Sequence, residues 1–241
     1  MKNFLKLITL SLITISCNGL QNNIEQYSIE TLMSNNRSSG GYFSKDASKL
    51  IYSSDKSGIF NIYEVDLKTN EETQLTDSEE ESFFSRGYSP STDEVIYSAD
   101  IGGNENSHIY IIRDGKSIDL TPGKNTKASF FGWTNDELEM YVISNYRDAR
   151  FFDLYKIDIE TLNSKMVFKN DRGYNLNSIS HNDNYLVLSL NISRSEQKLF
   201  LFDVKSTQQI EISNQVANFS GQNFDKNDEN YFYTTNYDSE F

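Results

Sequence analysis

The feature that most constrains the fold is an internal repeat with a period of about 45 residues. Five segments of fourteen residues align without gaps, and each has a hydrophobic start, a polar turn, an apolar run and a final Asp or Asn. These final residues are Asp55, Asp100, Asn145, Asn191 and Asn236, so the successive spacings are 45, 45, 46 and 45. Self-similarity at a fixed period indicates copies of one supersecondary unit that pack against each other.

A second anchor keeps the same period in four of the units. The anchor is a short run with strand composition, IYEVDL in the first unit, and its aromatic residues are Tyr63, Tyr110, Tyr155 and Phe200. These aromatic residues are 47, 45 and 45 positions apart. Because two independent anchors share one period, we interpret the repeat as the unit of the fold.

Each unit has the composition of four short antiparallel strands. In the first unit, the polar turn at residues 44–49 and the turn at Gly58 separate runs rich in Tyr, Ile and Val, which favour strands. Aromatic residues make up 13% of the chain and proline occurs only twice. The sequence therefore predicts an all-β fold, a β-propeller of four-stranded blades, over residues 40–241.

The count of units leaves the ring open. Units start near residues 42, 87, 132, 178 and 223, which gives four complete blades and a partial fifth. One alternative is a tight five-bladed ring that residues 24–34 complete. We favour the other alternative, a chain cut short, because native proteins avoid bare sheet edges.

The N-terminus is predicted to be an export signal. Residues 1–16 carry Lys2 and Lys6 before a short apolar run, which is too short to span a bilayer. The chain's only cysteine, Cys17, follows this run, and the site resembles the lipobox of bacterial lipoproteins, although Thr14 departs from its pattern. The alternative is an ordinary signal peptide that contains a cysteine. We expect a lipid anchor at Cys17, a tether over residues 17–39, and a place in the cell envelope.

Composition argues against several other classes of partner. The chain has 22 basic and 35 acidic residues, for a net charge of −13, which disfavours nucleic acid. One cysteine excludes an internal disulfide framework, and two histidines leave little room for a metal site. We therefore expect no metal and no cofactor.

The repeat resembles the propeller unit shared by TolB-like proteins and the prolyl oligopeptidase family of serine peptidases. In residues 43–76 the resemblance rests on Phe43, Ser44, Asp46, Tyr52, Ser54, Asp55, Ile62, Tyr63, Asp66, Leu67, Gln74, Leu75 and Thr76. Residues 106–133 and 144–158, with their Leu-Thr-Pro-Gly turn and Arg-Asp-x-Arg-Phe-Phe-Asp-Leu-Tyr run, are similar to bacterial dipeptidyl aminopeptidase and acylaminoacyl-peptidase relatives.

The resemblance implies a catalytic α/β-hydrolase domain after the propeller, with a Ser nucleophile in a Gly-x-Ser-x-Gly elbow. These 241 residues contain no such motif. For His108 and His181 we expect structural or surface roles, since neither has a nucleophile beside it in the sequence. We therefore assign no catalytic residue in this chain.

Arg147 and Arg150 are the candidate substrate-facing residues. They either bind a substrate carboxylate or pair with Asp148 and Asp153, and the sequence favours pairing. Glu79, Glu80 and Glu81 are interpreted as a solvated charge run in a blade connection. Residues 225–230 partly resemble a Ca²⁺ loop but lack its Gly and closing Glu, so we predict a hairpin turn.

These observations lead to one functional hypothesis and two alternatives. The hypothesis is the substrate-gating propeller of an exported, lipid-anchored serine peptidase that acts on short peptides through a hydrolase domain absent from this chain. The first alternative is a non-catalytic TolB-like envelope propeller that mediates protein–protein interaction, and the second is a propeller adaptor attached to some other envelope domain.

Overall fold

The computed structural model describes residues 27–238, so residues 1–26, including Cys17, lie outside the described part. The chain divides into two compact units, residues 1–36 and 37–241. In the first unit, helix α2 (Ile29–Met33) begins after Ser28, whose Oγ accepts a hydrogen bond from the Thr31 N–H at 3.1 Å. Residues 29–33 therefore form a helix, and the alternative in which residues 24–34 supply a closing strand is wrong for this segment. No helix within residues 27–238 is long and apolar enough to cross a bilayer.

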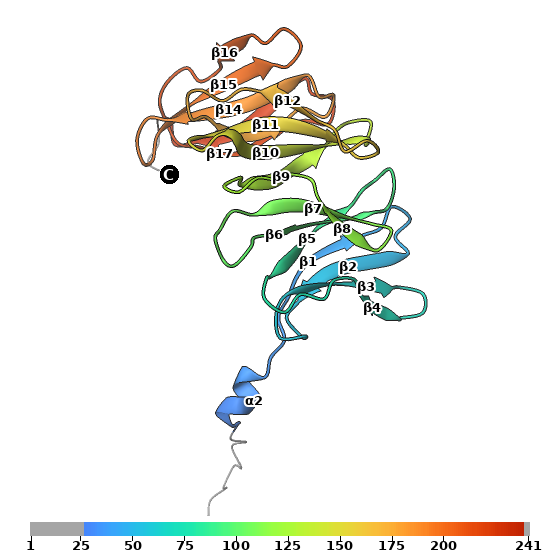
Figure 1. The fold of residues 1–241 in the computed structure, drawn as a ribbon. Helices are drawn as coiled ribbons and strands as arrows, with labels where there is room; N and C mark the ends of the chain where they lie inside the picture. The colour runs from blue at the N-terminus through green and yellow to red at the C-terminus, as the bar shows by residue number, and fades with distance from the viewer. Residues whose placement is uncertain (1–26, 239–241) are drawn as a thin grey trace, which may run out of the picture. The chain divides into compact units, whose positions relative to one another are not determined.

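The second unit contains four four-stranded antiparallel sheets and one two-stranded sheet (Figure 1). In the first and second sheets the strands are β1 (Ser38–Phe43), β2 (Lys49–Ser54), β3 (Asn61–Asp66), β4 (Glu72–Gln74), β5 (Phe83–Tyr88), β6 (Val95–Ala99), β7 (His108–Arg113) and β8 (Lys116–Asp119). In the third and fourth they are β9 (Ala128–Trp133), β10 (Glu139–Asp148), β11 (Phe151–Asp158), β12 (Ser164–Phe168), β13 (Asn175–Ile179), β14 (Tyr185–Asn191), β15 (Gln197–Asp203) and β16 (Gln209–Glu211). The fifth sheet contains β17 (Phe219–Phe224) and β18 (Tyr231–Thr235).

The polar turn of each repeat joins the first two strands of its sheet. In the first blade, the Ser44 Oγ accepts the Lys49 N–H at 3.0 Å and donates to the Asp46 carboxylate at 2.8 Å. One residue of this turn has a left-handed backbone in all five units, with φ between 54° and 63°, namely Ala47, Asp93, Glu137, Asp183 and Asp228. Three of the five are Asp, a residue type that tolerates this conformation. The turn chemistry in the sequence therefore sets the hairpin in each blade.

Successive sheets stack face to face, and each apolar core forms between two neighbours. The third sheet places Met140, Val142 and Ile157 against Ile96 and Ile109 of the second sheet. The same arrangement joins the first sheet to the second, the third to the fourth, and the fourth to the fifth. This blade-on-blade packing confirms the predicted β-propeller.

The described blades do not close into a ring. In the first four blades one position at the centre of the second strand is fully buried, and it is occupied by Ile51, Ile96, Tyr141 and Val187. The equivalent residue of the fifth sheet, Phe232, is 61% exposed. The apolar side of β18 that would face a further blade therefore lies open within residues 27–238.

Turn aspartates connect neighbouring blades. The Asp93 carboxylate accepts the Lys45 N–H at 3.3 Å, and the Asp183 carboxylate accepts the Asn135 N–H at 2.8 Å. Asp228 likewise accepts the His181 N–H at 2.9 Å. The same aspartate that permits the left-handed turn thus holds the turn of the preceding blade.

Candidate functional site

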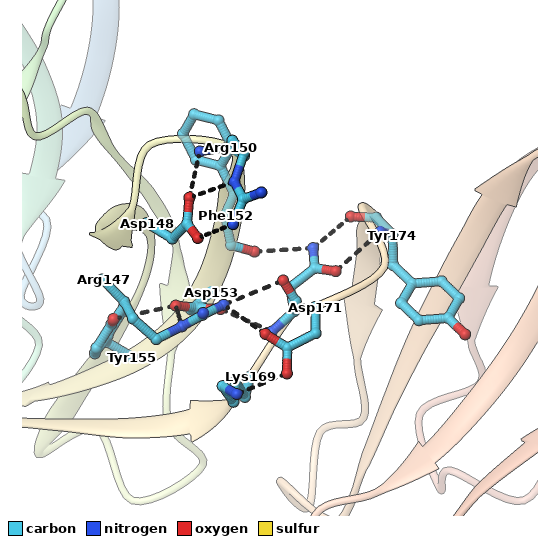
Figure 2. A network of polar contacts seen from close by, with 10 residues as sticks. Arg147, Asp148, Arg150, Phe152, Asp153, Tyr155, Lys169, Asp171 and Tyr174 are labelled. Atoms are coloured by element: carbon cyan, nitrogen blue, oxygen red, sulfur yellow. Dashed lines mark hydrogen bonds and ion pairs between the residues drawn. The ribbon is translucent and has the colours of Figure 1, made fainter.

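The two predicted arginines lie at the end of the longest hairpin in the structure. Strands β10 and β11 are ten and eight residues long, and Asp148 pairs with Phe151 across their tip. The ladder between them shifts register between Ser144 and Asp148. This extension carries Arg147 and Arg150 to the tip of the hairpin, where Figure 2 shows them beside Asp153 and Asp148.

Asp153 is the centre of the site. Its side chain is fully buried, and its carboxylate accepts hydrogen bonds from Arg147 Nε at 2.7 Å and Arg147 Nη2 at 2.9 Å. It also accepts the backbone N–H of Asn170 at 2.7 Å and the hydroxyl of Tyr155 at 3.3 Å. A buried carboxylate needs such donors because its desolvation is otherwise costly. Asp153 in turn raises the pKa of the Arg147 guanidinium above its ordinary value.

Arg147 has further acceptors on the chain that leaves the blade. Its Nη2 lies 3.2 Å from the Asn170 carbonyl oxygen and 3.2 Å from an Asp171 carboxylate oxygen. Among the described residues, no contact of Arg147 uses Nη1, and 24% of the side chain is exposed. The guanidinium is therefore fixed in position and keeps one nitrogen for another acceptor.

Asn170 joins the third blade to the start of the fourth. Its side-chain amide donates to the Phe152 carbonyl at 3.0 Å and to the Tyr174 carbonyl at 2.8 Å, and its Oδ1 accepts the Tyr174 N–H at 2.9 Å (Figure 2). Asn170 and Asp171 were not predicted as site residues. A signal was available, because the third unit has Phe168-Lys169 where the first two units have a Leu-Thr pair, and Asn170 and Asp171 follow directly.

Arg150 is much more exposed than Arg147, at 77% of its side chain. Its Nε and Nη2 donate to the Asp148 carboxylate at 3.0 and 2.7 Å, and its backbone N–H donates to the same group at 3.0 Å. These hydrogen bonds, those of the side chain first, hold the pKa of Asp148 well below its usual range. Both arginines are thus paired with the aspartates that the sequence offered, and Arg150 presents its free edge to solvent.

The network consists of paired charges that can hold a ligand. Three cations, Arg147, Arg150 and Lys169, face three carboxylates, Asp148, Asp153 and Asp171, so the formal charges cancel. A guanidinium held in this way donates to a carbonyl or carboxylate oxygen with little loss of side-chain entropy. The site is therefore suited to positioning a ligand.

The other residues named from the sequence lie apart from this network. On β7, His108 is buried and its Nδ1 lies 2.7 Å from the Asp119 carboxylate. His181 lies in a turn, with Nδ1 2.8 Å from the Asp228 carboxylate. Each imidazole thus has a carboxylate partner within the fold, and the structure brings neither histidine to Arg147.

The acidic candidates also lie elsewhere. Glu79, Glu80 and Glu81 occupy the connection between β4 and β5 and line a cleft of about 620 Å³. Residues 225–230 form the hairpin turn between β17 and β18, where Asp225 accepts the Glu229 N–H at 2.8 Å, which confirms the predicted turn. Within residues 27–238 there is no group of three His, Cys, Asp or Glu side chains that could hold a metal ion.

Comparison with known proteins gives the family. Residues 76–241, more than half of the chain, match the N-terminal β-propeller domain of prolyl oligopeptidase. The chain belongs to the prolyl oligopeptidase family. Within that family it is similar to dipeptidyl aminopeptidase BIII of Pseudoxanthomonas mexicana, with 34% identity over 87 residues. This match covers 35% of the chain and 12% of the relative, so the chain spans a small part of that protein's length.

Solved structures show the same fold at low sequence identity. TolB from Acinetobacter baumannii has a TM-score of 0.52 and 16% identity, over 83% of this chain and 54% of that one. Prolyl oligopeptidase B from Galerina marginata has a TM-score of 0.60 and 13% identity, over 82% and 30%. An oligogalacturonate lyase has a TM-score of 0.66 and 14% identity, over 84% and 63%. At these identities the likeness concerns the propeller fold alone.

Proposed function

We propose that this propeller is the substrate-gating part of an exported serine peptidase of the prolyl oligopeptidase family that acts on short peptides. The observation that carries the proposal is the family match over residues 76–241, and the 34% identity to a dipeptidyl aminopeptidase supports it. The Ser, Asp and His of catalysis belong to an α/β-hydrolase domain outside these 241 residues, which contain no Gly-x-Ser-x-Gly elbow.

The packing between blades supports the gating role. Each interface between blades is an apolar core, and the blades are further joined through aspartates such as Asp93 and Asp183. A wall of this kind over a hydrolase site admits a short or unfolded peptide and excludes a folded protein. The selectivity is then steric, and it is independent of the residues that cleave the peptide bond.

Within this proposal, Arg147 and Arg150 face the peptide. Arg147 keeps Nη1 for a carbonyl or carboxylate oxygen, while Asp153 fixes the rest of its guanidinium. Arg150 offers the exposed edge of its guanidinium at the hairpin tip. Because both cations are neutralised by aspartates, we expect a hydrogen-bonding role that orients the peptide, with little long-range attraction of anions.

Export and anchoring complete the proposal. Residues 1–16 supply the signal, and Cys17 becomes the lipidated N-terminus of the mature protein in the cell envelope. More than one acyl chain is needed for stable anchoring, which is the form that bacterial lipoproteins carry. The enzyme then works on peptides at a membrane surface.

The test uses the product of the full reading frame and two substrates with the same cleavable sequence. One is a short chromogenic peptide, and the other is a folded protein with that sequence in a tight surface loop. We expect cleavage of the peptide and no cleavage of the folded protein. Equal cleavage of both substrates would refute gating. If the full-length product is folded but cleaves neither substrate, the result would favour the non-catalytic envelope propeller.

The arginines are tested with the same peptide. Arg150→Ala is expected to raise KM several-fold with kcat unchanged, and Arg150→Lys to restore part of the loss, because the removed contact binds the peptide before the chemical step. Lys165→Ala, at an exposed position of strand β12 in the same blade, is the control. Unchanged KM in Arg150→Ala would remove this residue from the substrate path.

A further inference from the structure

A pocket of about 410 Å³ lies between the second and third blades. One wall is the connection from β8 to β9, residues 120–126, and the other is the side of the third sheet that carries Val142, Ser144 and Tyr155. Its size falls in the range of about 300–1,000 Å³ that small-molecule sites occupy. The pocket is separate from the arginines, although Tyr155 joins the two places through its hydrogen bond to Asp153.

The repeat explains why space exists here. In the second blade, Tyr97 pairs with Tyr110 across neighbouring strands, and their rings stack with centroids 5.0 Å apart and an interplanar angle of 13°. The same cross-strand pair in the third blade is Val142 and Tyr155. The third blade therefore has Tyr155 at the position of Tyr110. At the position of Tyr97, however, it has Val142 in place of a second ring.

The fourth blade fills the same position in another way. Leu188 pairs there with Phe200, and the ring of Tyr174 meets Phe200 edge to face with centroids 5.3 Å apart. Both flanking interfaces thus contain an aromatic pair at this level, whereas the cross-strand pair at the interface between the second and third blades has one ring, Tyr155, beside the pocket. Val142 is smaller than the tyrosine at the equivalent position of the second blade, which leaves room for a ring beside Tyr155 at the wall of the pocket.

Two hydroxyls of residues that line the pocket accept hydrogen bonds from the backbone. Thr121 Oγ1 accepts the Ile109 N–H at 2.9 Å, and Ser144 Oγ accepts the Tyr146 N–H at 3.2 Å. Each hydroxyl therefore uses a lone pair and retains its hydrogen for donation. No charged side chain lines the pocket, so the site offers donors to an uncharged acceptor and no partner for an ion.

Tyr155 is fixed as a platform. Burial, and then the nearby Asp153 carboxylate, raise the pKa of Tyr155 to about 12, so its phenol is protonated at neutral pH. The ring of Tyr146, 69% exposed, stands at the rim of the pocket. The pocket is therefore open to a ligand from solvent and has a neutral aromatic floor.

We propose that this pocket binds an uncharged aromatic ring with a polar substituent, as in a tyrosine side chain or a small phenol, stacked on Tyr155 as Tyr97 stacks on Tyr110. The ring takes the place that the second blade gives to Tyr97, and its substituent accepts hydrogen bonds from Thr121 and Ser144. This site is independent of the peptidase activity, because it needs only the second and third blades.

The first test is a calorimetric titration of the full-length protein with p-cresol. We expect saturable binding at one site, about fivefold tighter than that of 4-methylcyclohexanol, the ratio that a ring–ring contact supplies. The peptide acetyl-Gly-Tyr-Gly-amide distinguishes the two sources of the ring: binding at least as tight as that of p-cresol indicates a peptide, and weaker binding indicates a small phenol. Absence of saturable p-cresol binding would overturn the proposal.

The second test fills the pocket with a residue that the repeat already uses. Val142→Tyr copies Tyr97 of the second blade, and we expect it to weaken p-cresol binding at least tenfold without lowering the melting temperature. Lys165→Tyr adds the same ring on the side of β12 that faces away from the pocket, and this variant should bind p-cresol as the wild type does. If Val142→Tyr does not fold, Ser144→Leu, which copies Leu190 of the fourth blade, replaces it. A folded filling variant with unchanged p-cresol affinity would refute the site.

Discussion

Arg147 and Asp153 form a two-point ion pair, with Nε 2.7 Å from Oδ2 and Nη2 2.9 Å from Oδ1. Asp153 stands at the start of the third strand of its blade, a position that binds nearby polar groups in every complete blade. The equivalent residues are Asn61, which accepts the Ser78 N–H, His108, which contacts Asp119, and Lys198, which contacts Glu211. The third blade thus uses a common structural position to hold an arginine at the tip of its hairpin.

Replacement of this carboxylate should destabilise the protein. In Asp153→Asn, the Asn170 N–H and the guanidinium lose a charged acceptor in a buried place, and we expect a loss of about 2 kcal/mol in the free energy of unfolding. Urea unfolding measures the change. Asp148→Asn, which removes the partner of the exposed Arg150, is the matched control and should change stability much less. Equal losses in the two variants would contradict the assignment of Asp153 as the anchor.

Turn aspartates should make stability depend on pH on the acidic side. Hydrogen bonds from the Ser48 backbone and side chain, and then from Ser44, lower the pKa of Asp46 from 3.8 to about 2. Since the folded pKa lies below the unfolded one, the stabilising contribution is complete above about pH 4 and is lost as the pH falls toward 2.

The Asp46→Asn variant tests this pH dependence. It retains a side-chain acceptor for the turn but cannot titrate. Its urea midpoint should therefore fall less than that of the wild type between about pH 5 and about pH 2, the interval over which the wild-type carboxylate loses its stabilising contribution. Parallel midpoint curves for the two proteins would show that this turn does not contribute to acid sensitivity.

Gly123 should be intolerant of a side chain. A Cβ built on Gly123, whose φ is +156°, would lie 2.0 Å from Oγ1 of Thr126, within the connection that forms one wall of the pocket. We expect Gly123→Ala to lower the free energy of unfolding by about 1–3 kcal/mol through this overlap. Gly132→Ala, where a Cβ meets nothing within 4 Å, should stay within about 0.5 kcal/mol of the wild type. Similar behaviour of both variants in thermal unfolding would contradict the close approach.

The lipid anchor is tested at the chain's only cysteine. Cys17→Ala should move the protein from the membrane fraction to the soluble envelope fraction and abolish its labelling with a radioactive fatty acid, because the thiol is the site of acylation. Ser11→Ala, in the apolar run of the signal, is the control and should stay with the membranes. Membrane partitioning that does not change in Cys17→Ala would refute lipidation.

Local patterns in the sequence predicted much of the fold. The period of about 45 residues predicted the blades. The polar turns predicted the hairpins, because Asp and Ser determine local backbone geometry through contacts only a few residues away. Helix α2 was not anticipated, since five residues with one capping Ser make a weak signal beside a strong repeat.

The site was only partly visible in the sequence. Asp153 could be named as a partner for Arg147 because they are six residues apart on one hairpin, whereas Asn170 and Asp171 reach them only through the pairing of β11 with β12. The pocket depends on the difference in volume between Val142 and Tyr97 at equivalent positions, which becomes meaningful only when the cross-strand partners Tyr155 and Tyr110 are known.

The most direct measurement of the central claim is labelling of the full-length protein with a fluorophosphonate probe for serine hydrolases. We expect that one serine, in a Gly-x-Ser-x-Gly sequence on the same polypeptide as residues 40–241, reacts with the probe, and that a short peptide substrate competes with the labelling. A folded full-length protein that is not labelled would contradict the assignment of this propeller to a serine peptidase.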